Sequence, residues 1–405
     1  MARLTGDTRR SYGLVVVAAL GYTCLLFVWF SLPAYLTRII EEIGLSGTQA
    51  GVLVGAVPLT YIPLALVTGV VIDRAGPGRG LAAGVTVYGV AQIARSFATG
   101  FPSLLATTLL IGVGATAITF GLPKLVSELF PPGRTGFPSS IYLIGASAGS
   151  ASVFAVGRPI LGPALGGWRP LFFWSGVVAV GYAVVWTAIV RVSEIDHRSP
   201  NDDSDFSIDS IRDDLRLILS HRELQLVVVI GTMYLLVNHG IQGWLQTVLE
   251  SRGLGTARAG LTTSAFVGAV AAGTLTVPAV ADRFAVRRPA LIACGGLVSL
   301  GGVGIVAGGA TPLVYVGVVV TGLGVGGLSP LIRAIPPELD GIGARLTGTA
   351  IGFVFAVGEI GGFLGPVVVG TLREATGSFL PGLVTLSAGG LLVVLAGEAL
   401  RRKVV

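Results

Sequence analysis

The sequence predicts an all-α integral membrane protein with twelve transmembrane helices in two pseudo-symmetric halves of six helices each. The first observation is composition: 52% of the 405 residues are hydrophobic and only 12% are charged, whereas a soluble domain carries about 25% charged residues. The second is an internal repeat. Gly44–Gly51 resembles Gly253–Gly260, and Asp73-Arg74 recurs as Asp282-Arg283, each 209 positions later. A repeat of this length in an apolar chain indicates a duplicated membrane unit.

Apolar runs of about 20 residues recur along the chain, and each is long enough to cross roughly 30 Å of hydrocarbon. Continuous runs favour helices over the alternating pattern of a β-barrel. In the first half we expect helices at 13–37, 48–71, 80–99, 103–126, 137–161 and 169–191. In the second half we expect them at 224–248, 258–280, 289–308, 312–332, 346–369 and 378–400.

The polar, aspartate-rich stretch 193–222 cannot cross a bilayer and divides the chain into predicted domains at 1–192 and 223–405. An even number of helices places both termini on one side. Of the 27 Lys and Arg residues, 19 lie on the same side as the termini and the linker. In membrane proteins the loops on the cytoplasmic side carry the excess of basic residues. We therefore expect a multi-pass protein of the plasma membrane with both termini and the linker in the cytoplasm.

The sequence offers no pattern for an enzyme, a metal or a cofactor. Cys24 and Cys294 both lie in apolar segments, and the three histidines are scattered, so neither a disulfide nor a metal site is expected. There is no phosphate-binding loop and no nucleophile–base cluster. The basic residues are spread along the chain, which argues against a nucleic-acid partner.

The loop after the second helix has an ordered pattern of glycine, acidic and basic residues. It holds Gly69, Asp73-Arg74, Gly76 and Arg79, and a degenerate copy holds Asp282-Arg283. A glycine such as Gly69 lets a helix approach its neighbour closely. This pattern resembles the signature of the major facilitator superfamily.

Two further repeated elements strengthen this resemblance. Gly162-Pro163 and Gly365-Pro366 look like the glycine–proline element of that family, and Arg134-Thr135-Gly136 has a partner in Arg345-Leu346-Thr347-Gly348. The resemblance extends over essentially the whole chain. It implies a secondary transporter that works by alternating access, with a cytoplasmic gate at Gly69, Asp73, Arg74, Gly76, Arg79, Arg134, Asp282, Arg283 and Arg345. The alternative is that these residues only set the topology.

At a finer level, Leu122–Val126 together with Phe130-Pro131 resembles the cyanate and nitroimidazole transporter group, which is related to nitrate and nitrite carriers. The resemblance favours a small anion or polar metabolite as solute, carried by a monomer, with protons as a candidate coupling ion. The alternative is proton-coupled efflux of a lipophilic drug or metabolite. Thr108 stands where proton antiporters of the family often carry an arginine, which counts against a typical drug exporter.

Ionisable residues inside apolar spans are candidates for the site, because a charge at mid-bilayer is costly. Glu359 is either a protonatable coupling group or a structural hydrogen-bonding group. His239 corresponds to Phe30 in the repeat and is expected to face the central cavity, with Asn238 and Gln242 as further polar contacts. A buried neutral histidine is the alternative. Lys124 either attracts anions or extends its ammonium group to the membrane surface.

The remaining candidates are aromatic or lie near helix ends. Trp29, Phe30 and Trp244 are expected either to line the transport pathway or to belong to the aromatic belts that face lipid. Arg95 and Arg158 are expected to anchor the outer membrane surface or to form part of an outer gate.

Overall fold

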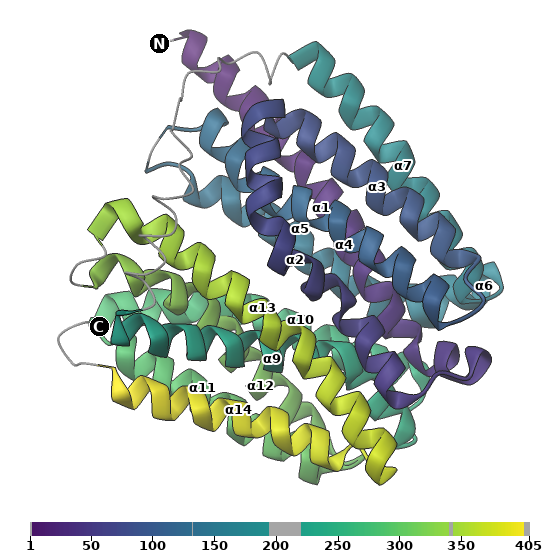
Figure 1. Cartoon of the computed structure of the whole chain (residues 1–405). Coiled ribbons are helices and arrows are strands. Elements are labelled where there is room, and N and C mark those ends of the chain that lie inside the picture. Colours follow the sequence, from purple (N-terminus) through teal and green to yellow (C-terminus); the bar gives the residue numbers. More distant parts are fainter. Residues whose placement is uncertain (1, 132, 194–219, 340–342, 401–405) are drawn as a thin grey trace. The chain divides into compact units, whose positions relative to one another are not determined.

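The computed structural model describes residues 2–131, 133–193, 220–339 and 343–400, with the side chains of 2–8, 66, 338 and 343–346 excepted. All regular structure in these ranges is helical (Figure 1). The first set of helices is α1 (Ala2–Ile43), α2 (Gly47–Ala75), α3 (Pro77–Ser96), α4 (Phe101–Leu129), α5 (Gly136–Ser152), the π-helix η1 (Val153–Leu161), α6 (Gly162–Leu165) and α7 (Trp168–Ser193). The second set is α9 (Arg222–Ser251), α10 (Thr256–Phe284), α11 (Arg287–Gly308), α12 (Pro312–Ala334), the 3-10 turn η3 (Pro336–Glu338), α13 (Gly343–Thr376) and α14 (Leu380–Ala399).

The predicted class of fold is confirmed. Within the described ranges, eleven helices are long and apolar enough to cross a membrane by length and composition. The remaining expected span, near 80–99, is the helix α3, which carries Arg79 and Arg95.

Contacts divide the chain into two compact units. The first unit comprises Met1–Leu45 and Leu59–Pro200, and the second comprises Ser46–Pro58 and Asn201–Val405. The N-terminal part of α2 is therefore grouped with the second unit. The predicted domain limits at 1–192 and 223–405, with their linker, stay a prediction, and the linker residues 194–219 lie outside the described ranges.

Repeated glycines explain why the same pairs of helices pack tightly in each unit. A Cβ atom added to Gly114 would lie 2.5 Å from the carbonyl oxygen of Gly84, so only glycine lets α4 approach α3 this closely. At the repeated position, a Cβ on Gly324 would lie 2.7 Å from the carbonyl oxygen of Cys294, between α12 and α11. The repeat thus encodes close contacts between small residues.

A second repeated contact joins the first and fifth spans of each unit. The Tyr35 hydroxyl of α1 donates a hydrogen bond to the carbonyl oxygen of Gly157 at 3.2 Å. In the second unit the indole nitrogen of Trp244 on α9 donates to the carbonyl oxygen of Pro366 on α13 at 2.9 Å. These two bonds occupy equivalent positions, 209 residues apart. An aromatic donor therefore holds the same pair of helices in both units.

The region expected as one regular helix at 137–161 differs from that prediction. Its last third is the π-helix Val153–Leu161, which contains Pro159. Proline has no N–H to donate and cannot maintain the α-helical hydrogen-bond ladder, and wider π turns are one way in which a helix accommodates such a break. In the second unit the corresponding stretch belongs to the continuous α-helix α13, which contains Pro366 without a π segment.

The N-terminal part of α2 packs on α13 inside the second unit through glycines spaced four residues apart. A Cβ on Gly51 would lie 2.6 Å from the carbonyl oxygen of Pro366, and one on Gly55 would lie 2.7 Å from that of Phe363. The contact continues to Gly47, where an added Cβ would collide with the carbonyl oxygen of Gly370. Beside it, the backbone N–H of Thr48 donates to Glu374 Oε2 at 2.8 Å. This stretch of α2 is therefore bound to α13 by backbone-to-backbone packing.

Candidate functional site

The two strongest ionisable candidates lie together in the second unit. His239 on α9 and Glu359 on α13 approach to 3.8 Å between Nε2 and Oε2. Their side chains are only 10% and 14% exposed. The two residues are 120 positions apart in the sequence, and the tight packing of α9 on α13 brings them together. The structure thus pairs two residues that the sequence singled out separately.

Glycine makes room for this pair. A Cβ atom on Gly362 would lie 2.6 Å from Glu359 Oε2 and 3.0 Å from a ring carbon of His239, and the Pro58 side chain closes the same space. Among the described atoms, Glu359 Oε2 is buried and accepts no hydrogen bond. A buried acceptor in this state is costly, and a proton on the carboxyl group would remove part of that cost.

The neighbouring polar candidates on α9 differ in exposure. Gln242 is 8% exposed and lies in the packed interior, while Asn238 is partly exposed. Tyr234, one helical turn before Asn238, is partly buried and packs edge-to-face against Phe355 of α13. The α9–α13 contact therefore includes the His239–Glu359 pair and the Tyr234 side chain.

Lys124 forms an ion pair with the acidic residue of the gating motif. Its Nζ lies 2.9 Å from Asp73 Oδ1, and the two side chains are 40% and 56% exposed. Lys124 was expected as a solute contact or a surface-directed lysine, and Asp73 as a gate residue. The structure links α4 to the end of α2 through these two side chains, so Lys124 is part of the motif's charge network.

The second copy of the motif uses a different pairing. Asp282 Oδ1 lies 2.9 Å from Nε of Arg287, at the start of α11. Arg333, which stands at the position of Lys124 in the repeat, lies over the Phe355 ring at 4.0 Å instead. The duplicated Asp-Arg motif therefore keeps its acidic residue in a charge pair in both units while changing the partner.

The other gate candidates with described side chains lie at or near the ends of helices. Arg74, Arg79, Arg134 and Arg283 are exposed. Gly76 has φ +87°, which only glycine adopts readily, and precedes the proline that starts α3. The close-approach role expected for Gly69 is wrong in this structure, because an added Cβ would meet nothing within 4 Å in the described part. The Arg345 side chain lies outside the described residues.

Trp29 and Phe30 belong to an aromatic cluster in the first unit. Their rings stack at 5.6 Å, and Trp29 also packs against Tyr61 at 6.0 Å. Tyr61 continues to Phe120 at 6.1 Å. Trp244 is fully buried against Phe379, with its indole nitrogen bonded to Pro366. A pathway role for these residues stays a prediction, although Trp244 has a clear packing role.

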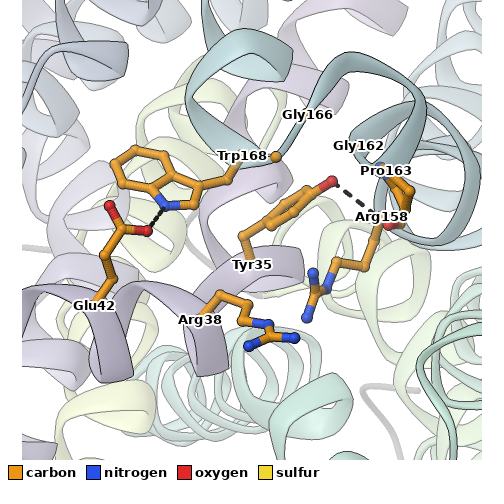
Figure 2. Close-up of a pocket in the computed structure, with 9 residues that line it drawn as sticks. Tyr35, Arg38, Glu42, Arg158, Gly162, Pro163, Gly166 and Trp168 are labelled. Atoms are coloured by element: carbon orange, nitrogen blue, oxygen red, sulfur yellow. Dashed lines mark hydrogen bonds between the residues drawn. The ribbon is translucent and has the colours of Figure 1, made fainter.

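The two arginines expected at the outer surface have different surroundings. The anchoring role expected for Arg95 is wrong, because its side chain is wholly buried and donates to Val28 O at 2.7 Å and Ser31 Oγ at 2.8 Å. Arg158 lies over the Tyr35 ring at 4.5 Å, beside a cavity (Figure 2). The π-helix that carries Arg158 was not predicted from sequence.

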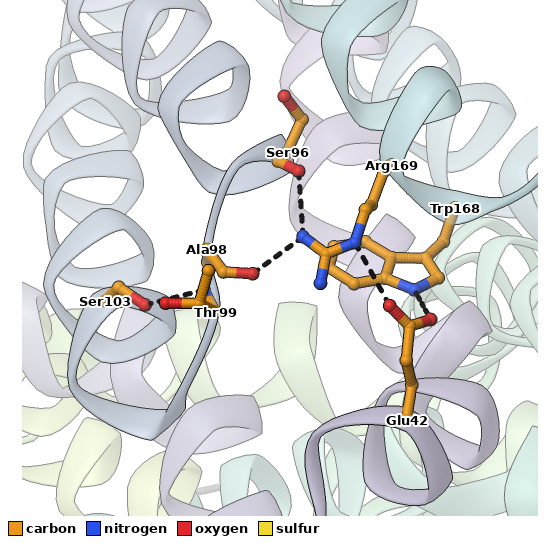
Figure 3. Close-up of polar contacts among 7 residues, drawn as sticks. All are labelled: Glu42, Ser96, Ala98, Thr99, Ser103, Trp168 and Arg169. Carbon is orange, nitrogen blue, oxygen red and sulfur yellow. Dashed lines mark hydrogen bonds and ion pairs between the residues drawn. The ribbon is translucent and has the colours of Figure 1, made fainter.

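Sequence reasoning also missed a network of polar contacts near the end of α1 (Figure 3). Glu42 accepts from Trp168 Nε1 at 2.7 Å and from Arg169 Nε at 3.1 Å. Arg169 also donates to the carbonyl oxygens of Ser96 and Ala98. These bonds tie the end of α1, the α3–α4 turn and the start of α7 together. The run of glycines before Trp168 was the only sequence signal for this region.

The described residues contain no group of three or more His, Cys, Asp or Glu side chains that could hold a metal ion. The candidate groups are a buried carboxyl–imidazole pair in the second unit, and an exposed charge pair and an aromatic cluster in the first unit. Together with a set of helices long and apolar enough to span a membrane, this arrangement is typical of a membrane transporter.

Comparison with known proteins identifies the family. Residues 18–366 match the model described as Major Facilitator Superfamily. The chain is 31% identical over 360 residues to the 3-(3-hydroxy-phenyl)propionate transporter of Escherichia coli, covering 88% of this chain and 85% of that protein. It is 25% identical over 385 residues to the probable nitrate/nitrite transporter NarK2 of Mycobacterium tuberculosis, covering 90% of each chain.

The fold agrees with this relationship. The crystal structure of the nucleoside transporter NupG matches with a TM-score of 0.75 at 12% identity, covering 96% of this chain and 98% of that one. The chain belongs to the Major Facilitator Superfamily, and it is a multi-pass membrane transporter for small solutes rather than an enzyme. The resemblance read from Asp73-Arg74 and its repeat is thereby confirmed.

Proposed function

We propose that the protein is a secondary active transporter that moves a small anion, foremost an organic carboxylate, together with protons by alternating access. It acts as a monomer in the plasma membrane, with both termini in the cytoplasm. The observation that carries this proposal is the buried pair His239 and Glu359, 3.8 Å apart in the second unit. Intramembrane ionisable residues commonly mark proton or substrate pathways.

The chemistry of the pair suits proton coupling. In its neutral form the Glu359 carboxyl group holds a proton. In its ionised form the carboxylate can form an ion pair with a protonated His239 imidazole. Tyr234 on α9 and Arg333 on α12 lie against the same stretch of α13, since both side chains contact Phe355. Protonation of Glu359 would change the electrostatic surroundings of these two groups.

An anionic solute is supported by the names of two relatives, a hydroxyphenylpropionate transporter and a nitrate/nitrite transporter. Co-transport of a proton with an anion reduces the charge that must cross the apolar bundle. The gate is supported by the Asp73–Lys124 ion pair, which joins α2 to α4. The predicted halves at 1–192 and 223–405 would be the bodies that move.

The test is transport into proteoliposomes. Radiolabelled nitrite, cyanate, benzoate and 3-phenylpropionate are offered from an acidic exterior with an alkaline lumen. Accumulation of at least one anion above the level in protein-free liposomes, abolished by a protonophore, is the expected result. If none of them accumulates and a lipophilic cation is expelled instead, the proposed solute class and direction are wrong.

Efflux of a lipophilic compound is the second candidate, and it rests on the aromatic cluster of the first unit. Trp29, Phe30, Tyr61 and Phe120 form a continuous run of rings, and the Tyr61 hydroxyl shares a hydrogen bond with Thr119. Aromatic rings make favourable contacts with apolar compounds. The same proteoliposomes, loaded with a lipophilic dye, distinguish this candidate by dye loss under an inverted pH gradient.

A further inference from the structure

A cavity lies near the C-terminal end of α1, beside the π-helix η1 and the start of α7 (Figure 2). Its volume is about 330 Å³, and its walls include Tyr35, Arg38, Glu42, Arg158, Gly162 and Trp168. All of these residues belong to the first unit. Cavities that hold small molecules begin at about 300 Å³, so this one can hold a compact ligand.

Two aromatic walls of the cavity are held rigidly. The Tyr35 side chain is 2% exposed, and its hydroxyl donates to the Gly157 carbonyl oxygen at 3.2 Å. Trp168 is 4% exposed and is fixed by the 2.7 Å hydrogen bond from its Nε1 to Glu42. The small exposed edges of these two side chains are therefore preformed, which lowers the entropic cost of binding.

The charges around the cavity favour an anion. The guanidinium groups of Arg38 and Arg158 both line it and lie on the same side of Tyr35 in Figure 2. Glu42 is committed elsewhere, since its two oxygens accept from Trp168 and Arg169. Arg38 lies 3.5 Å from Glu41 in a pair that is about two-thirds exposed, and such pairs hold weakly. Two cationic side chains on one cavity give it a positive potential, which favours an anion there.

Comparison within the chain shows that these arginines are not part of the shared scaffold. At the repeated positions the second unit has Trp244, Thr247 and Val367 in place of Tyr35, Arg38 and Arg158. The aromatic hydrogen bond is kept, but both positive charges are absent. The π-helix that carries Arg158 has no counterpart in α13, and π-helical turns are frequent at functional sites.

We propose that this cavity binds a small oxyanion. Arg38 and Arg158 donate hydrogen bonds to its oxygen atoms, and Tyr35 and Trp168 cover its apolar part. A planar guanidinium fork matches a carboxylate or a phosphate. The oxyanion comes either from a soluble carboxylate or from the headgroup of an anionic phospholipid. The site contains no residue of the His239–Glu359 pair.

The first experiment measures binding of benzoate to the purified full-length protein in neutral detergent by isothermal titration calorimetry. Benzyl alcohol, which has the same ring but no charge, is the control ligand. We expect benzoate to bind. We expect Arg38→Gln and Arg158→Gln each to weaken its affinity about tenfold to a hundredfold, since each removes a charged hydrogen-bond donor. Benzyl alcohol should not distinguish the variants.

Three variants control for general effects. Arg258→Gln removes one positive charge from an exposed position on α10 and should leave benzoate affinity unchanged. Arg158→Lys keeps the charge but loses the planar fork, so its affinity should lie between those of wild type and Arg158→Gln. Arg38 is 65% exposed, so its substitution keeps the test available if Arg158→Gln does not fold.

A second experiment, on lipid retention, identifies the source of the oxyanion. Native mass spectrometry compares retention of phosphatidylglycerol and phosphatidylcholine by wild type and by both arginine variants. The site would be assigned to a lipid headgroup by three results together. Wild type retains phosphatidylglycerol, both variants lose it, and benzoate displaces it. Benzoate binding without such retention would assign it to a soluble anion.

The proposal is overturned if neither benzoate nor phosphatidylglycerol responds to the substitutions at Arg38 and Arg158. Failure of the proposed transport mechanism would appear in proton-driven accumulation and not in benzoate binding. Glu359→Gln should retain the arginine-dependent benzoate binding in detergent, whatever it does to proton-driven accumulation. Binding and transport can therefore be judged separately.

Discussion

The indole nitrogen of Trp244 donates a hydrogen bond to the carbonyl oxygen of Pro366 at 2.9 Å, and this bond repeats the one between Tyr35 and Gly157. Each bond spans 122 residues and joins the first span of a unit to its fifth. The aromatic residue changes between the units, but the donor and the carbonyl acceptor are kept. Gene duplication has therefore preserved a contact rather than a side chain.

Trp244→Phe should destabilise the protein, because it removes the donor from a wholly buried site. A lost internal hydrogen bond costs about 1 kcal/mol, and Trp244→Ala should cost roughly 3–5 kcal/mol by leaving a cavity. Thermal unfolding in detergent should show stability falling in the order wild type, Trp244→Phe, Trp244→Ala. The control is Trp174→Phe, at a position that is 53% exposed, and an equal loss there would show that the hydrogen bond is irrelevant.

Glu359→Gln should abolish proton-driven accumulation while sparing solute exchange. Glutamine keeps the shape of the side chain but cannot release a proton, so it mimics the neutral carboxyl group permanently. Counterflow and pH-driven uptake in the same proteoliposomes separate the two activities. Wild-type accumulation should rise as the exterior becomes more acidic than the lumen. A Glu359→Gln protein that still accumulates solute along a pH gradient would remove this residue from coupling.

Asp73→Asn should slow transport a few-fold without changing which solutes compete. The Asp73–Lys124 pair is about half exposed, and such pairs contribute roughly 0–1 kcal/mol, so the effect on rate is modest. Lys124→Gln should have a similar effect. The exchange Asp73→Lys with Lys124→Asp should recover part of the rate. A changed competition profile in any of these variants would place the pair in the solute site instead of the gate.

Gly365→Val should destabilise the protein clearly, whereas Gly352→Val on the same helix should not. A Cβ on Gly365 would collide with the carbonyl oxygen of Leu236 on α9, but a Cβ on Gly352 meets nothing within 4 Å in the described part. Overpacking of this kind costs roughly 1–3 kcal/mol or more. Size-exclusion chromatography and thermal unfolding report the difference. Two variants of equal stability would show that the α9–α13 contact tolerates separation.

The order of the membrane helices could be predicted from the sequence because hydropathy and the 209-residue repeat are local or periodic signals. Glu359 and His239 could be recognised individually, since a charged residue in an apolar span is rare. Their contact could not be predicted, because it depends on how closely α9 packs on α13 and on the space left at Gly362. Lys124 and Asp73 were likewise identifiable individually, but their pairing was not.

The sequence by itself determined that the chain lies in a membrane, that it is duplicated and that it belongs to a transporter family, because composition and repeated motifs are properties of the chain alone. Only the tertiary structure decided which charged groups meet. It buried Arg95, paired Glu359 with His239, and placed Arg38 and Arg158 on one cavity. The physical reason is that burial and charge pairing act over a few ångströms between segments far apart in sequence, and helix packing alone sets those distances.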